Sequence, residues 1–177
     1  MNVVAVAARS FALGTWLASG VRPMTCPPLD DTSLPAALWE ADVAYVTLHG
    51  GDGDPYLRGD GDIPALSIIT LGGVELPGTL VYMAGCWGAP QWSDAFLAAG
   101  ARAVVADRNT AWAGRWLPLG SHAIGREWLR SLRDGERAGE ALDLARLNYA
   151  ATHTGVRDRE MLDSVALYGD RYAMVPG

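Results

Sequence analysis

The chain has 177 residues and a formal net charge of −6, with 50% of its residues hydrophobic and 19% charged. This length predicts one domain over residues 1–177 with enough chain to bury a sizeable core. The acidic balance excludes the usual nucleic-acid binders, which carry a basic face. No apolar run reaches the ~18 residues of a membrane span and the N-terminus lacks a signal-peptide pattern, so we expect a cytoplasmic protein with no membrane partner.

Two cysteines, Cys26 and Cys86, are too few for a disulfide framework, and the three histidines show no spacing typical of a zinc site. The sequence therefore predicts reduced thiols, no metal and no cofactor. Aspartates in the segment 50–62 raise the question of calcium, but counting from Asp52 the EF-hand pattern fails. A solvated acidic loop is the favoured interpretation, and a looser calcium site is the alternative.

The first half of the chain alternates apolar runs with helical and loop segments. The apolar runs at 2–7 and 43–49 predict core strands. Between them we expect a helix over 11–20 that ends at Gly20, a proline-rich loop at 21–32 and a short helix over 33–42. A surface loop at 50–62 and a small hairpin around Gly72-Gly73, over 65–76, follow.

The second half continues the alternation. Core strands are predicted at 79–85, 101–107 and 164–170, with a helix over 90–100 between the first two. A helical tract over 111–135 is interrupted near Pro118 and Gly120, and a further helix covers 136–152. These strands are apolar throughout rather than alternating, which is typical of a sheet buried on both faces. The pattern predicts an α/β fold with a mostly parallel sheet in a three-layer α/β/α sandwich.

Two of the predicted strands end in a similar way. VAYVTLHGG, residues 43–51, closes on His49 and two glycines, and TLVYMAGCWG, residues 79–88, closes on Cys86 between glycines. Ligands of open α/β sheets bind outside the carboxyl ends of the strands. If the two strands are neighbours, both side chains lie over the same edge.

A thiol near an imidazole is the minimum for nucleophilic catalysis by cysteine, because the thiolate reacts and the histidine handles protons. The glycines let the backbone approach a substrate closely, and the N–H groups of Gly50 and Cys86 are candidates for an oxyanion site. Taken singly, Cys86 is more often a small buried hydrophobe and His49 more often a structural histidine. Their joint occurrence at two strand ends favours the functional interpretation.

The segments VAYVTLHGG, ALSIITLGGVELPGTLVYMAGCWG and DAFLAAGARAVVA resemble, in order and spacing, the CHAT branch of the caspase-like (clan CD) cysteine peptidases. DSVALYGD resembles the terminal strand that gingipain-like relatives share. The resemblance covers about residues 41–172. It implies an α/β/α sandwich in which His49 is the general base or acid, Cys86 is the nucleophile and Gly50 supplies an oxyanion N–H.

This resemblance implies a cysteine endopeptidase that cleaves a peptide or protein substrate through a thioester acyl-enzyme. Asp107 ends the strand after the Cys86 strand, and we expect it to select arginine, or lysine second, before the cut. Its structural alternatives are pairing with Arg108 or capping the next helix.

A second interpretation is a catalytically silent caspase-like module that binds a regulatory partner protein, which the bulky Trp87 beside the cysteine favours. The third is a generic α/β ligand-binding domain in which the histidine and cysteine are coincidental.

Overall fold

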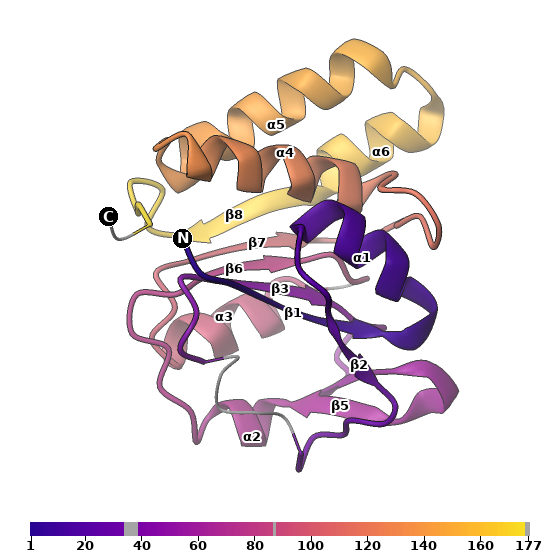
Figure 1. The fold of residues 1–177 in the computed structure, drawn as a ribbon, viewed down its shortest axis with the longest axis vertical. Coiled ribbons are helices and arrows are strands. Elements are labelled where there is room, and N and C mark those ends of the chain that lie inside the picture. Colours follow the sequence, from indigo (N-terminus) through magenta and orange to yellow (C-terminus); the bar gives the residue numbers. More distant parts are fainter. Residues whose placement is uncertain (34–38, 87, 176–177) are drawn as a thin grey trace.

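A six-stranded sheet runs through the centre of the computed structural model, which describes residues 1–33, 39–86 and 88–175 (Figure 1). In spatial order its strands are β2 (Met24–Cys26), β1 (Val3–Ala8), β3 (Val43–Thr47), β6 (Leu80–Met83), β7 (Ala103–Asp107) and β8 (Val165–Gly169). Neighbouring strands are parallel from β2 to β7, and β8 pairs antiparallel with β7 at the edge. The mostly parallel sheet predicted from the sequence is confirmed.

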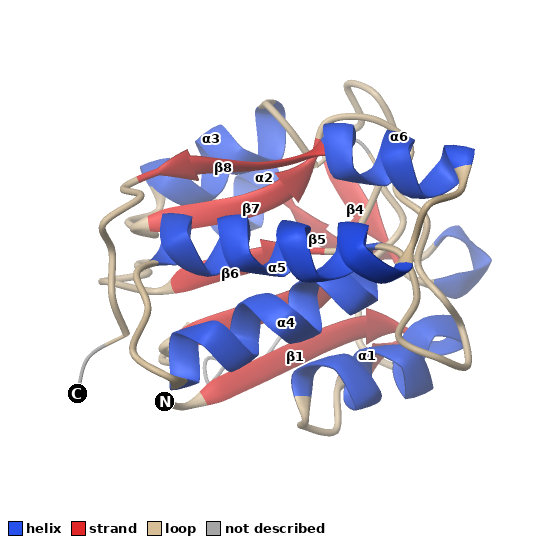
Figure 2. Cartoon of the chain, turned by 90° about the horizontal axis from the view of Figure 1, so that it is seen from above, coloured by secondary structure: helices blue, strands red, loops and turns tan. Residues whose placement is uncertain are grey.

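Helices cover both faces of this sheet (Figures 1 and 2). One face carries α1 (Ala12–Ser19), α4 (Ser121–Arg133), α5 (Ala138–Thr152) and α6 (Val156–Ser164). The other face carries α2 (Ile68–Leu71), α3 (Gln91–Ala98) and a hairpin of β4 (Tyr56–Arg58) with β5 (Pro64–Ser67). The three-layer α/β/α arrangement is therefore also confirmed.

The central strands send successive side chains into two separate hydrophobic cores, because a strand alternates its faces residue by residue. Tyr45 and Tyr82 pack with Trp128 on the α4 side. Val46 and Met83 belong to the cluster on the α3 side. Since both faces are buried, the strands need apolar residues at every position, which explains their unbroken apolar runs.

Helix α4 lies unusually close to the sheet at Gly125. A Cβ at this position would lie 2.5 Å from the hydroxyl oxygen of Tyr45 and 2.7 Å from the ring of Tyr82. Glycine is thus required here by close approach, since any larger side chain would push the helix away from the strands.

Four local expectations differ from the structure. The predicted loop at 21–32 contains β2, which adds an edge strand beside β1. The predicted loop at 50–62 contains β4, so β5 pairs with this earlier segment, and the 65–76 segment continues from β5 into α2 instead of forming a hairpin around Gly72-Gly73. Residues 111–120 form no helix, and α6 is an additional helix before β8. These short elements gain their stability from tertiary partners rather than from sequence periodicity.

Residues 34–38, which are half of the helix predicted over 33–42, lie outside the described residues, as does Trp87. Within the described part of the chain, no helix combines the length and apolar character needed to cross a membrane.

Candidate active site at the carboxyl edge of the sheet

His49 and Cys86 occupy equivalent places beyond two neighbouring parallel strands. The last paired residues of β3 and β6 are Val46 and Met83, and the Ala84 amide extends the pairing by donating to the Val46 carbonyl at 2.8 Å. Each candidate residue lies three positions further on, from 46 to 49 and from 83 to 86. The structure therefore brings both to the same edge of the sheet, as the sequence predicted.

The backbones of the two loops are in direct contact. A Cβ on Gly50 would overlap the carbonyl oxygen of Cys86, and a Cβ on Gly85 would lie 2.6 Å from the carbonyl oxygen of Leu48. Glycine at both positions lets the loops touch. Gly50 thereby lies against the Cys86 carbonyl, and its role as an oxyanion N–H donor stays a prediction.

The imidazole of His49 is held at the surface by three neighbours. The backbone of His49 forms two 2.8 Å hydrogen bonds with the backbone of Arg58 in β4. Its ring centroid lies 5.3 Å from that of Phe11, and its Nε2 lies 3.4 Å from Oδ1 of Asp60. The side chain remains 46% exposed, so the ring is oriented by these contacts and is still accessible.

The thiol of Cys86 is partly buried and donates a hydrogen bond to the carbonyl oxygen of Ala111 at 3.3 Å. Burial raises the pKa of this thiol, and the nearby Asp107 carboxylate raises it further. No hydrogen bond joins the thiol to His49 in the part of the chain that the structure describes. In this state Cys86 is a protonated thiol that donates to Ala111 rather than to His49.

Asp107 lies inside the protein, beneath this edge. Its side chain is fully buried, its Oδ2 accepts a 3.0 Å hydrogen bond from Ser121 at the start of α4, and its Oδ1 has no partner in the described structure. Burial raises the pKa of the carboxyl group to about 7. The structure does not expose this carboxylate to a substrate side chain, and it pairs with the start of α4 rather than with Arg108.

A buried polar network extends from Asp107 under the carboxyl edge of the sheet. Tyr82 donates a 2.7 Å hydrogen bond to the Ser121 carbonyl, and its ring stacks on Tyr45 with centroids 5.0 Å apart. The Tyr45 hydroxyl in turn contacts Nδ1 of His122 at 3.2 Å. Burial lowers the pKa of His122 to about 4, so this histidine is neutral at neutral pH and has a structural role.

Sequence reasoning missed the residues that surround the imidazole. Ser10 and Phe11 follow β1, and Asp60 lies in a 3-10 turn between β4 and β5. Ser10 and Phe11 could have been found by the rule that identified His49, because they too follow a predicted strand and so lie at its carboxyl end. The place of Asp60 depends on the β4–β5 pairing, which no local pattern indicated.

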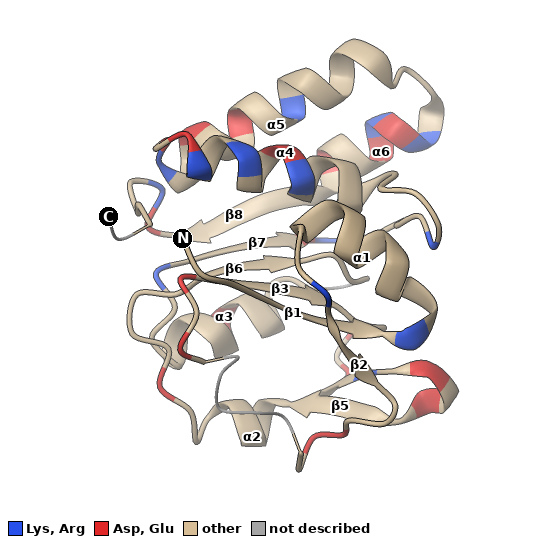
Figure 3. Cartoon of the chain, viewed as in Figure 1, with Lys and Arg blue, Asp and Glu red and all other residues tan. Residues whose placement is uncertain are grey.

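Three of the four aspartates in the segment 50–62 are engaged with neighbouring protein groups. Asp54 and Asp62 lie 2.9 and 3.4 Å from Arg58, whereas Asp60 accepts hydrogen bonds from Ser10. Figure 3 shows the acidic turn at the tip of the β4–β5 hairpin. Across residues 1–33, 39–86 and 88–175, no group of three or more histidine, cysteine or acidic side chains is arranged to hold a metal ion.

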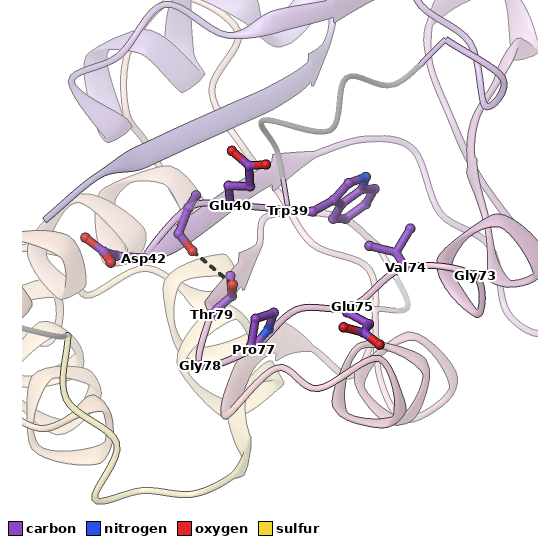
Figure 4. Close-up of a pocket in the computed structure, with 10 residues that line it drawn as sticks. Trp39, Glu40, Asp42, Gly73, Val74, Glu75, Pro77, Gly78 and Thr79 are labelled. Atoms are coloured by element: carbon purple, nitrogen blue, oxygen red, sulfur yellow. Dashed lines mark hydrogen bonds between the residues drawn. The ribbon is translucent and has the colours of Figure 1, made fainter.

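A pocket of about 470 Å³ opens at the opposite, amino-terminal edge of the sheet (Figure 4). Its walls include Trp39, Asp42 and Glu75, and the Thr79 hydroxyl closes it by donating to the Ala41 carbonyl at 2.9 Å. This pocket is separated from His49 and Cys86 by the length of the strands.

No protein-family model and no curated protein sequence matches the chain. Solved structures do match. The Arg-specific cysteine proteinase gingipain R superimposes with a TM-score of 0.67 at 13% identity, over 98% of this chain and 47% of that one. The fold is caspase-like.

A second caspase-like match is the complex of Porphyromonas gingivalis RgpB pro- and mature domains, with a TM-score of 0.71 at 12% identity and coverage of 98% and 48%. A third, described as a protease, has a TM-score of 0.63 at 11% identity. The chain spans about half the length of each of these proteins. At such low identity the likeness shows the caspase-like fold of the gingipain structures and does not by itself show activity.

Proposed function

We propose that this chain is a cysteine endopeptidase of the caspase-like type, in the CHAT branch, with His49 and Cys86 as its dyad. The observation that carries the proposal is their equivalent position, three residues beyond the last pair of neighbouring parallel strands. An imidazole and a thiol are thereby held over one sheet edge by loops in backbone contact. These are the two groups that thiol-based acyl transfer needs.

The reaction begins when the imidazole of His49 takes the proton of the Cys86 thiol. The thiolate then attacks the carbon of the substrate carbonyl group. The carbonyl oxygen becomes an oxyanion, which the N–H groups of Gly50 and Cys86 stabilise. As the carbon–nitrogen bond breaks, the imidazolium gives its proton to the leaving amine and a thioester remains. Water, deprotonated by His49, attacks this thioester, releasing the carboxylic acid and returning the proton to Cys86.

The proposed substrate is a peptide or protein cut after arginine or lysine. The net charge of −6 favours basic peptides by long-range attraction. Asp107 is the proposed pocket acid. Because Asp107 is fully buried, this assignment requires the segments that cover its carboxylate to move when substrate binds. The assignment is tested by measuring cleavage of fluorogenic peptides that differ only in the residue before the scissile bond. If Asp107 selects that residue, Asp107→Ala should remove the preference for arginine that the wild type shows.

The alternative proposal is a silent module that binds a partner protein through the same edge. The hydrogen bond from the Cys86 thiol to the Ala111 carbonyl favours this alternative, because it holds the sulfur protonated and away from His49. The two proposals differ in one measurable property. Only in the peptidase does His49 accelerate the reaction of Cys86 with an electrophile.

The experiment compares the alkylation rate of Cys86 by iodoacetamide in Cys26→Ala and in Cys26→Ala/His49→Ala proteins. The peptidase predicts that loss of His49 slows alkylation, and that an arginine-containing peptide electrophile labels Cys86. His153→Ala is the matched control, because His153 stacks on Tyr149 at the end of α5 and does not contact the site. Equal rates with and without His49, together with no peptide cleavage, would establish the silent module.

A further inference from the structure

We propose that Asp60 is a positioning residue that holds the imidazole of His49 in one orientation and one tautomer, with Nδ1 left to serve Cys86. This inference rests on the proposed function for its catalytic consequence. The arrangement of Asp60 and His49 is itself a separate, measurable property of the fold.

The Asp60 carboxylate is fixed before it meets the histidine. Its Oδ2 accepts a 2.7 Å hydrogen bond from the backbone N–H of Ser10, and its Oδ1 accepts another of 2.7 Å from the Ser10 hydroxyl. Oδ1 also lies 3.4 Å from Nε2 of His49. The carboxylate therefore bridges the end of β1 and the residue that follows β3, two neighbouring strands.

The end of β1 also positions the ring directly. Phe11, next to Ser10, lies with its ring centroid 5.3 Å from that of His49 at an interplanar angle of 56°. The imidazole thus packs against the ring of Phe11 on one side and has the Asp60 carboxylate near Nε2. Two independent contacts of different kinds restrict the same ring, which a chance surface ion pair would not require.

The charge of Asp60 suits this role. Burial raises the pKa of the carboxyl group, but the two Ser10 hydrogen bonds and the pairing with His49 lower it by more, so its pKa lies below the usual range. Asp60 is therefore an ionised acceptor at neutral pH.

An ionised acceptor at Nε2 selects the tautomer whose proton sits on that nitrogen. The lone pair of the neutral ring is then on Nδ1, where it can take the thiol proton. The same carboxylate stabilises the imidazolium that forms, which is the part an aspartate plays in hydrolytic triads. Because both side chains are partly exposed, at 46% and 33%, orientation rather than strong Coulomb attraction is the expected contribution.

The test is a double-mutant cycle on the alkylation rate of Cys86 in the Cys26→Ala background. Asp60→Asn keeps the shape and one oxygen that can accept from the Ser10 N–H, but it removes the charge and the second acceptor oxygen, and we expect a rate about 10- to 100-fold lower, the range typical of residues that orient a functional histidine. In the His49→Ala protein the same Asp60→Asn change should have no further effect, because Asp60 acts through His49. Asp60→Glu should restore part of the rate.

Asp54→Asn is the matched control. Asp54 lies in the loop before β4 and binds Arg58 rather than His49, so its loss should leave the His49-dependent rate unchanged. Two-bond ¹⁵N–¹H spectra supply a readout that a structural role would not move. With three histidines in the chain, His49 is assigned by its loss in His49→Ala. Its neutral ring should show the Nε2–H tautomer alone in the wild type and both tautomers in Asp60→Asn.

Failure of the positioning role of Asp60 can be distinguished from failure of the proposed peptidase. A tautomer pattern unchanged by Asp60→Asn, or an equal rate loss with and without His49, would overturn the positioning role. If His49→Ala does not slow Cys86 at all, the proposed peptidase is wrong, while the spectra still decide whether Asp60 orients the ring.

Discussion

Replacing Asp107 with asparagine should change how the stability of the protein depends on pH. The Asp107 carboxyl is fully buried, has one hydrogen bond from Ser121 and one oxygen without a partner in the described structure. Burial raises its pKa to about 7. In the unfolded chain the same group titrates near ~3.9. Between these two values the folded protein keeps a proton that the unfolded chain releases, so stability falls as pH rises through this window.

The size of the effect follows from the difference between the two pKa values. About three units at ~1.4 kcal/mol each give up to about 4 kcal/mol of stability lost between pH ~4 and ~7.5. Asp107→Asn cannot ionise and avoids this loss. The free energy of unfolding of the variant minus that of the wild type should therefore increase with pH by a few kcal/mol, whatever constant cost the amide adds.

His122 opposes this dependence in the wild type. Burial lowers its pKa to about 4, below the ~6.5 of an unfolded histidine, so its contribution rises as pH increases through that interval. The wild-type profile is therefore flatter than either group alone would make it. The difference between the variant and the wild type cancels the His122 contribution and isolates Asp107.

The assay is urea unfolding of both proteins at pH 4.5, 5.5, 6.5 and 7.5. Asp134→Asn, an exposed carboxylate beyond α4, is the matched control and should leave the profile close to wild type. A difference between Asp107→Asn and wild type that stays constant across this range would refute the reasoning, because it would mean that Asp107 ionises alike in the folded and unfolded chains.

Two further predictions concern packing. Gly50→Ala should impair both folding stability and Cys86 reactivity, since its Cβ would overlap the Cys86 carbonyl; thermal melting and alkylation rates measure this, and wild-type values for both would contradict the close approach. Phe96→Ala should lower the free energy of unfolding by about 3–5 kcal/mol in urea, because Phe96 is fully buried against Trp92. A loss below 1 kcal/mol would show that the core on the α3 side is loosely packed.

Much of the architecture was predictable because it depends on local patterns of apolar residues in the sequence. The runs ending at Thr47, Met83 and Asp107 are apolar on both faces up to their last residues, so they required a sheet covered on both faces. The same logic placed His49 and Cys86 together, since parallel neighbours end at one edge. Strong helical periodicity likewise predicted α5 and the later part of the 111–135 tract as α4.

Other features depend on partners far away in the chain. The three-residue strands β2 and β4 have too few residues for a recognisable period and exist only through pairing with β1 and β5. The antiparallel direction of β8 follows from α5, which begins beside the end of β8, where the Ala138 amide donates to the Ala173 carbonyl, and returns the chain to the carboxyl edge. No local pattern specified either outcome.

The features of the candidate site likewise divide into those that are local in the sequence and those that depend on tertiary contacts. The sequence by itself determined that a histidine and a cysteine stand at strand ends, because residue type and strand boundary are local properties. Only the tertiary structure decided that Asp107 is buried under that edge and that Asp60, held by Ser10, reaches the imidazole. The reason is physical: burial and hydrogen-bond partners are set by which segments pack together, and Ser10 and Asp60 are 50 residues apart in the chain.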